Sequence, residues 1–285
     1  MANKVTSVAN KLVAITENLP AYCDAVSNAL ATIEGEHIML NDIASAERDL
    51  RVKVIADDPS AVTVMRHGKN WLDLGGENAG DWWNNGREFK RGTYVVGIAR
   101  TLAKSGGITD DMYAFDGGTL RVKSNVGYYG IGFPRKLLPN TQYTFSAQVN
   151  DPSVITVAYA LCDNDGNCTK HEGSWHDNKI TFTTNETGNV MLLLAPTEAN
   201  TEVTFSNIQL ELGSAVSEFE PFKVDTYTPS ADGTVEGVTS LYPVTVLKVD
   251  DAVMRASYFP TEQEATAQRH KRIMDEFAAL QNKGG

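Results

Sequence analysis

Residues 142–161 read QYTFSAQVNDPSVITVAYAL, and this stretch decides the fold class. Polar and apolar residues alternate from Gln142 to Gln148, and a second run, rich in β-branched and aromatic residues, extends from Ile155 to Leu161. Between them, Asp151 and Pro152 form a turn signal, because proline presets φ and aspartate bonds to the backbone close to it. The stretch therefore predicts two short strands joined by a turn.

Similar short runs continue on both sides at even spacing. They are Thr119 to Lys123, Tyr128 to Phe133, Lys179 to Thr184, Val190 to Leu194 and Glu202 to Leu212. The gaps hold further turn signals, such as Pro139-Asn140, Asp165-Gly166 and Thr187-Gly188. Evenly spaced strands without helices between them indicate an antiparallel sandwich or barrel.

The first 35 residues have a different pattern. Apolar residues recur three and four positions apart, as in a heptad seam: Val5, Val8, Leu12, Ile15 and Leu19. Pro20 suits the first turn of a second helix, so we expect helices from Lys4 to Glu17 and from Pro20 to Ile33, ended by Gly35. The seam fits either a helical pair packed within the chain or a homo-oligomer, for which a trimer is favoured.

The remaining segments define the predicted domain organisation. Short strands are expected within residues 37–65, long loops from Trp71 to Gly118, and strands again at 244–249 and 253–258. A capping box at 261–264 then predicts a terminal helix. The predicted division is 1–35 for helical assembly, 36–68 for a short β segment, 69–222 for the sandwich, 223–243 for an extended linker and 244–285 for a hairpin and helix.

Composition excludes some classes of function. The formal net charge is −11, with 25 Lys and Arg against 36 Asp and Glu, which opposes nucleic-acid binding because each phosphate contact needs a cation. The sequence holds no signal-peptide apolar region and no apolar run that spans a bilayer, so we expect a soluble protein made in the cytosol. Of three cysteines, Cys162 and Cys168 could face each other across a hairpin, and no disulfide framework is indicated.

Three groups of residues carry a resemblance to a known family. They are GKNWLD at 68–73, KLLPNTQYTFS at 136–146, and NIQLELGS at 207–214 with FEP at 219–221. In this order, and followed by the segment 227–243, they resemble minor structural proteins of phages and prophages of Gram-positive bacteria. Trp71 departs from the family's pattern, in which small aliphatic residues or Phe are commoner.

The resemblance covers roughly residues 42–243 and implies a jelly-roll domain similar to carbohydrate-binding modules. The expected fold is therefore mainly β: an antiparallel jelly-roll sandwich with short coiled-coil-like N-terminal helices and a C-terminal helix. The resemblance further implies a virion location, other virion proteins as partners, and a glycan of the host cell surface as a ligand.

Sugar-binding sandwiches usually present an aromatic platform, because the C–H face of a pyranose packs on a ring while nearby polar groups bond to its hydroxyls. The candidates are Trp82, Trp83, Arg87, Trp175, Tyr128 and Tyr129. Adjacent residues on an extended segment point to opposite faces, so Trp82 and Trp83 cannot both serve one face. Alternating sandwich core is the other interpretation of Tyr128 and Tyr129.

The acidic loops raise metal binding and catalysis as further interpretations. Residues 163–167 resemble the start of a calcium loop, but no bidentate Glu follows at the required place, and the same residues make a good hairpin turn. Carboxylates for glycoside cleavage could come from Asp110 and Asp111, or from Glu77, Asp81 and Glu88, although acidic loops are common on an acidic protein. We expect no catalysis and no cofactor.

The function expected from the sequence is a structural component of a phage particle, in a tail fibre, baseplate or similar appendage, with a host-surface or glycan-binding sandwich. A free carbohydrate-binding module and a tail-associated polysaccharide depolymerase are the alternatives.

Overall fold

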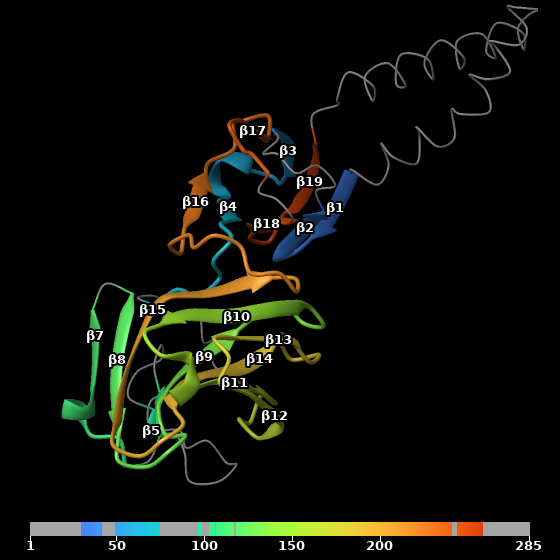
Figure 1. The fold of residues 1–285 in the computed structure, drawn as a ribbon. Helices are drawn as coiled ribbons and strands as arrows, with labels where there is room; N and C mark the ends of the chain where they lie inside the picture. The colour runs from blue at the N-terminus through green and yellow to red at the C-terminus, as the bar shows by residue number, and fades with distance from the viewer. Residues whose placement is uncertain are drawn as a thin grey trace, which may run out of the picture. The chain divides into compact units, whose positions relative to one another are not determined.

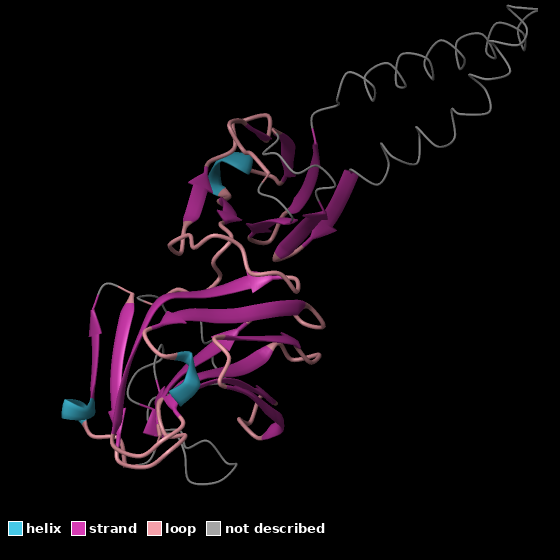
Figure 2. Cartoon of the chain, viewed as in Figure 1, coloured by secondary structure: helices cyan, strands magenta, loops and turns pink. Residues whose placement is uncertain are grey.

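The computed structural model describes residues 30–41, 49–74, 96–97, 103–105, 107–116, 118–240 and 244–258. The described residues form two compact units: unit 2 lies within Gly68–Lys223, and unit 1 combines the described residues before and after it. Strands dominate the described residues, and their pairs are antiparallel (Figures 1 and 2). The prediction of a mainly β, antiparallel fold is confirmed. In this part of the chain, no helix is long and apolar enough to cross a membrane.

Unit 2 consists of two sheets. The first has the order β13 (Lys179–Thr183), β10 (Gln142–Val149), β15 (Thr201–Leu212), β8 (Thr119–Ser124) and β7 (Tyr113–Asp116). The second has the order β12 (Cys168–Trp175), β11 (Ile155–Cys162), β14 (Asn189–Pro196), β9 (Ile131–Lys136), β6 (Ala103–Lys104) and β5 (Val96–Gly97). From β8 to β11, and again from β12 to β15, the chain alternates between the sheets, which is jelly-roll connectivity.

Side chains from both sheets fill the space between them. Phe133 of β9 lies against Phe145 of β10, with ring centroids 6.4 Å apart. Arg135 is also fully buried, and its guanidinium donates to the carbonyl oxygens of Pro134 and Asp73. Burial lowers the pKa of Arg135 to about 9, because a low-dielectric interior disfavours the charged form. Arg135 thus ties the segment before the sandwich to the core.

The two ends of unit 2 are held close together. Asn70 is buried, and its side-chain amide bonds to backbone groups of Ile208 and Leu210 in β15. At the other end, the N–H of Gly68 donates to the carbonyl oxygen of Lys223 at 2.8 Å. Unit 2 therefore begins and ends at neighbouring points.

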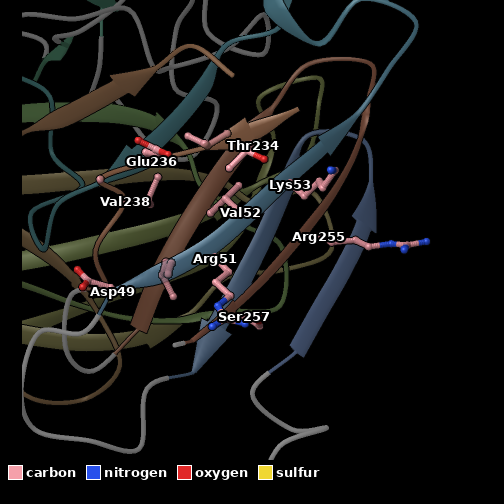
Figure 3. Close-up of a pocket in the computed structure, with 12 residues that line it drawn as sticks. Asp49, Arg51, Val52, Lys53, Thr234, Glu236, Val238, Arg255 and Ser257 are labelled. Carbon is pink, nitrogen blue, oxygen red and sulfur yellow. The ribbon is translucent and has the colours of Figure 1, made fainter. Parts of the chain in front are cut away.

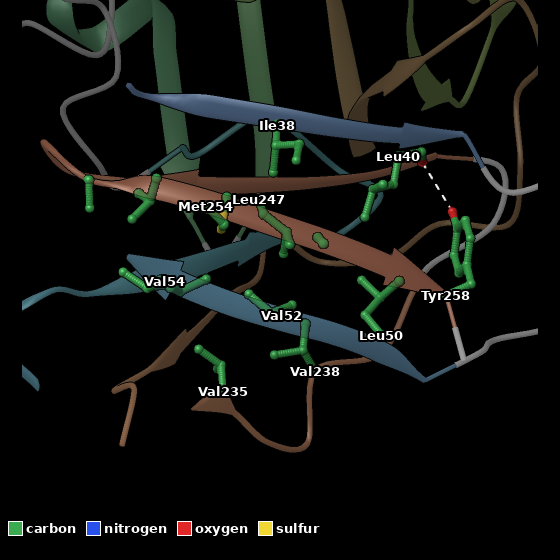
Figure 4. Close-up of a cluster of buried hydrophobic side chains, with 14 residues drawn as sticks. Ile38, Leu40, Leu50, Val52, Val54, Val235, Val238, Leu247, Met254 and Tyr258 are labelled. Atoms are coloured by element: carbon green, nitrogen blue, oxygen red, sulfur yellow. Dashed lines mark hydrogen bonds between the residues drawn. The ribbon is translucent and has the colours of Figure 1, made fainter. Parts of the chain in front are cut away.

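Unit 1 consists of two four-stranded sheets. One has the order β1 (Leu30–Glu34), β19 (Val253–Tyr258), β3 (Leu50–Ile55) and β17 (Thr234–Val235), and the other β16 (Val224–Tyr227), β4 (Val64–His67), β18 (Val244–Val249) and β2 (His37–Asn41). A cluster of aliphatic side chains, among them Val52, Leu247 and Met254, forms the core (Figure 4). The hydroxyl of Tyr258 donates to the carbonyl oxygen of Leu40 at 3.2 Å and anchors the end of β19 to this core.

Unit 2 is inserted between two paired strands of unit 1, since His67 at the end of β4 lies opposite Val224 at the start of β16. The segment expected to be a linker, 223–243, contains β16 and β17, and it shares the core of unit 1 with residues from the predicted segments 36–68 and 244–285. Local sequence patterns did not predict that residues 223–243 belong to unit 1, because the strands that pair with β16 and β17 lie far away in the sequence.

The prediction of a helix from Pro20 to Ile33 is wrong at its last residues. Leu30–Glu34 forms strand β1, which pairs with β19 more than 200 residues later in the sequence. The predicted seam Val5, Val8, Leu12, Ile15 and Leu19 and the predicted C-terminal helix lie outside the described residues.

Cys162 and Cys168 form a disulfide that joins the end of β11 to the start of β12. Between them, the carboxylate of Asp163 accepts hydrogen bonds from the N–H groups of Asp165 and Asn167 and from the side-chain amide of Asn167. Both carboxylate oxygens accept hydrogen bonds within the turn, so these residues form the hairpin turn that the sequence suggested.

Candidate functional site

Trp175 is the last residue of β12, the edge strand of the six-stranded sheet. It lies directly opposite Thr156 in β11, and 57% of its surface is exposed. Gly173 precedes it by two residues and therefore faces the same side of the sheet. A Cβ added at Gly173 would lie 3.2 Å from the Thr156 hydroxyl and 3.9 Å from the indole. The indole therefore lies back along the strand, beside Gly173.

Tyr128 comes from the loop before β9. Its N–H donates to the carbonyl oxygen of Pro196 at 2.7 Å, which fixes the loop against the end of β14. A Cβ at Gly130 would come within 2.0 Å of the Leu194 carbonyl oxygen, so glycine is required for this close approach. Tyr128 itself has a φ of 66°, in the left-handed region that non-glycine residues rarely adopt. Its conformation is therefore set by the packed backbone on either side.

Tyr128 and Trp175 meet at one end of the six-stranded sheet. Their ring centroids are 4.8 Å apart and their planes lie at 89°, an edge-to-face pair. Both side chains stay about half exposed, at 47% for Tyr128 and 57% for Trp175. Such a pair contributes roughly 0.5–1.5 kcal/mol, which restricts the rotation of both rings. We call Tyr128 and Trp175 the aromatic corner.

The aromatic corner has the chemistry of a sugar-binding platform. An exposed ring face accepts the apolar C–H face of a pyranose, and two rings at right angles can contact two sides of one sugar. The phenol hydroxyl of Tyr128 and the indole N–H of Trp175 can bond to sugar hydroxyls.

His176 follows Trp175 directly and adds an exposed polar ring beside the aromatic corner. The backbone N–H of His176 donates to the carbonyl oxygen of Ile155 at 3.0 Å, and the imidazole Nδ1 contacts the carbonyl oxygen of Ser153. A φ of 59° at His176 turns the chain away from the sheet and ends β12. The imidazole is therefore held in place at the edge of the corner.

The other predicted site residues fall elsewhere. Tyr129 is partly buried, and Trp82, Trp83 and Arg87 lie outside the described residues. Tyr128 was predicted to begin a strand, whereas β9 begins at Ile131. His176 was not among the predicted site residues. The glycines on either side of the Tyr128-Tyr129 pair were the signal that could have indicated a packed loop.

The carboxylates considered for catalysis have local partners where they are described. Asp110 and Asp111 lie in a 3₁₀ turn, η2 (Asp110–Met112), and the Asp110 carboxylate accepts from the Lys104 ammonium at 2.9 Å. The Thr109 hydroxyl bonds to Asp111 and holds the pKa of that carboxyl below its usual value. A glycosidase general acid needs a raised pKa, so Asp111 is poorly suited to that role. Glu77, Asp81 and Glu88 lie outside the described residues.

No family model and no curated protein matches the chain. Among solved structures, the Gap123 glycosylation-associated protein complex of Streptococcus agalactiae is 14% identical, with 48% of this chain and 46% of that chain covered and a TM-score of 0.30. The xylan-binding CBM22-1 domain of Paenibacillus barcinonensis Xyn10C is 14% identical, with 44% and 93% covered and a TM-score of 0.27. Tailspike protein 4 of bacteriophage CBA120 is 12% identical, with 50% and 21% covered and a TM-score of 0.28.

The match thus spans less than half the length of the streptococcal chain. All three TM-scores are below 0.5, so none of these similarities indicates a function for this chain.

Proposed function

We propose that unit 2 is a carbohydrate-binding sandwich that binds a neutral glycan at the aromatic corner. The supporting observation is the exposed pair Tyr128 and Trp175, at a centroid distance of 4.8 Å, on backbone fixed by hydrogen bonds and close packing. Exposed, rigid aromatic rings at a sheet end are a common feature of ligand sites. A neutral glycan is favoured over an anionic one because the chain carries a net charge of −11.

Affinity electrophoresis tests this proposal. The full chain is run through gels that contain one soluble polysaccharide each, from a panel of Gram-positive wall polysaccharides and neutral glucans. We expect retardation by at least one polysaccharide, and loss of that retardation in Trp175→Ala and Tyr128→Ala. Phe219→Ala is the matched control, since Phe219 is another aromatic residue of unit 2 that is 38% exposed.

The thermal midpoint separates a binding role from a packing role. Truncating a buried aromatic residue costs about 3–5 kcal/mol, whereas the half-exposed Trp175 should cost much less. Retardation that is unchanged in Trp175→Ala and Tyr128→Ala would exclude the aromatic corner as the binding site.

We also infer that the chain is a non-catalytic structural component of a phage particle that presents this sandwich to the host surface. The support is the order of the segments 68–73, 136–146 and 207–243, which resembles phage minor structural proteins. Mass spectrometry of purified particles should detect the chain in a fixed ratio to other virion proteins. Release of reducing sugar from host wall polysaccharide by the purified chain would instead indicate a depolymerase.

The homo-oligomer organised by residues 5–19 stays a prediction. At high salt, Leu12→Asp combined with Leu19→Asp should convert a trimer to monomers in sedimentation velocity, because charges cannot be buried in a heptad seam. An unchanged sedimentation coefficient would exclude the seam as the interface.

A further inference from the structure

Charge is unevenly distributed over unit 1. Its described residues hold five Lys and Arg against ten Asp and Glu. Three of the five cations, Arg51, Lys53 and Arg255, lie on the outer face of the neighbouring strands β3 and β19, and all three are exposed. Three of the five described cations of unit 1 are thus gathered on one surface, and we call these three residues the basic face.

Strand geometry places these cations together. In β3, buried and exposed residues alternate, so Arg51 and Lys53 point outward and lie roughly 7 Å apart along the strand. Arg255 is directly opposite Lys53 across the strand pair. Like charges in directly opposite positions repel each other. The ion pair between Lys53 and Asp232 relieves this only weakly, because its 3.8 Å contact joins two side chains that are both more than half exposed.

The basic face borders a hollow of about 650 Å³. Hydroxyl-bearing Thr234 and Ser257 line it together with the cations, and the Arg255 side chain extends away from the sheet (Figure 3). Asp49 and Glu236 lie on the side away from Arg255. The side of the hollow that holds Lys53 and Arg255 is therefore suited to a protruding, acidic segment of a protein.

The same unit supplies such a segment. Six exposed carboxylates lie around one end of the β1, β19 and β3 strands, and we call them the acidic end: Glu34, Glu36, Asp57, Asp58, Asp250 and Asp251. Two of the turns that carry them are joined, because the N–H of Gly35 donates to the Ala252 carbonyl and the N–H of Val249 donates to the Glu36 carbonyl. The acidic end is therefore a set of connected, protruding turns.

We propose that the basic face of one copy binds the acidic end of a second copy of this chain. Charge complementarity is the argument: each copy carries one surface of each sign on the same unit, and the repulsion between Lys53 and Arg255 is relieved when carboxylates approach them. The contact can be reciprocated in a two-fold pair or continued around a ring. Added salt weakens it, because exposed charges are screened over about 10 Å at 0.1 M ionic strength.

Charge reversal tests this proposal in the full chain. One variant combines Lys53→Glu with Arg255→Glu, and the other replaces Glu34, Glu36, Asp57 and Asp250 by Lys, so that four of the six charges of the acidic end are reversed. Asp251 is left unchanged because its φ of 41° disfavours most side chains. Arg121→Glu with Lys123→Glu is the matched control, since these are also two exposed cations at alternate positions of one strand, β8 of unit 2.

Sedimentation velocity at about 0.05 M and 0.5 M salt gives the first readout. We expect the wild-type chain and the control to associate at low salt and to lose this association at high salt. Each reversal variant alone should lack the salt-sensitive association, and an equal mixture of the two should regain it, because opposite charges then face each other again. If a reversal variant unfolds, Lys53→Gln with Arg255→Gln provides the same comparison with a smaller change.

Carbodiimide cross-linking gives a readout that is independent of any association through residues 1–29. In a mixture of unlabelled and ¹⁵N-labelled chains, we expect peptides that join Lys53 to the acidic end with one partner of each isotope. Reversal variants that associate like the wild type, or cross-links from Lys53 to the acidic end within single copies alone, would overturn the proposal.

Discussion

Excision of unit 2 should leave unit 1 folded, because the insertion begins and ends at two directly paired residues. His67 and Val224 face each other in the antiparallel pair of β4 and β16. The Cα atoms of such residues lie about 4.5–5.5 Å apart, a gap that a two-residue Asn-Gly turn spans. The variant therefore replaces residues 68–223 by Asn-Gly and keeps the rest of the chain.

Loop entropy predicts how the state of unit 2 affects unit 1. Folded unit 2 holds its own ends together through the Gly68 to Lys223 hydrogen bond, so it acts as a short, rigid connection. Unfolded, it becomes a flexible loop of 156 residues. Loop closure costs about (3/2)RT ln n, so this loop costs roughly 3 kcal/mol more than a turn of about four residues. Unit 1 should lose about that much stability when unit 2 is unfolded.

Hydrogen exchange of peptides from β3 and β19 measures this effect. We compare the full chain, the excised variant and Phe145→Asp, which places a charge in the fully buried core of unit 2. Protection of unit 1 should be similar in the first two proteins and about 100-fold lower in Phe145→Asp. An excised variant without protection, or a Phe145→Asp variant with full protection of unit 1, would refute this reasoning.

Three further predictions concern single features. Mutating Cys162 and Cys168 to Ser should lower the free energy of unfolding of unit 2 by about 2 kcal/mol, which is the chain-entropy value for so short a loop. Equal urea midpoints for the wild type and this variant would contradict the prediction. Burial lowers the pKa of His67 to about 4. As the pH falls, the unfolded state therefore takes up a proton before the folded state does. The free energy of unfolding of unit 1 should fall by up to roughly 3 kcal/mol between about pH 6.5 and about pH 4. Urea unfolding across this pH range checks the loss, which His67→Gln should reduce but not abolish, because burial also lowers the pKa of His37 in the same unit. Gly130→Ala should lower the thermal midpoint of unit 2 and weaken glycan binding together, because its Cβ would lie 2.0 Å from the Leu194 carbonyl oxygen; an unchanged midpoint would show that the loop can move.

The strands of the sandwich could be predicted because their signals are local. The runs Gln142 to Gln148 and Ile155 to Leu161 alternate or are apolar throughout, and they correspond to β10 and β11 within one residue. By contrast, β12 reads CTKHEGSW, and its mixed polar composition gave no strand signal. An edge strand pairs on one side only, so fewer of its positions need apolar side chains.

The aromatic corner could not be predicted as a pair, although both of its members were candidates. Tyr128 reaches Trp175 because its loop packs against the end of β14, and β14 pairs with β11, which pairs with β12. That chain of contacts depends on sheet order, which a single sequence does not contain. The same limit applies to unit 1, where β4 and β16 pair although all of unit 2 separates them in the sequence.

Indole resonances test the glycan-binding account most directly. The full chain is labelled with ¹⁵N at its four tryptophans, Trp175 is assigned by the signal that Trp175→Phe removes, and oligosaccharides from the best-retarding polysaccharide are titrated in. We predict a saturable shift of the Trp175 indole signal, with no shift for Trp71, which is buried against Tyr143. Binding that saturates while the Trp175 signal stays in place would contradict the assignment of the aromatic corner as the glycan site.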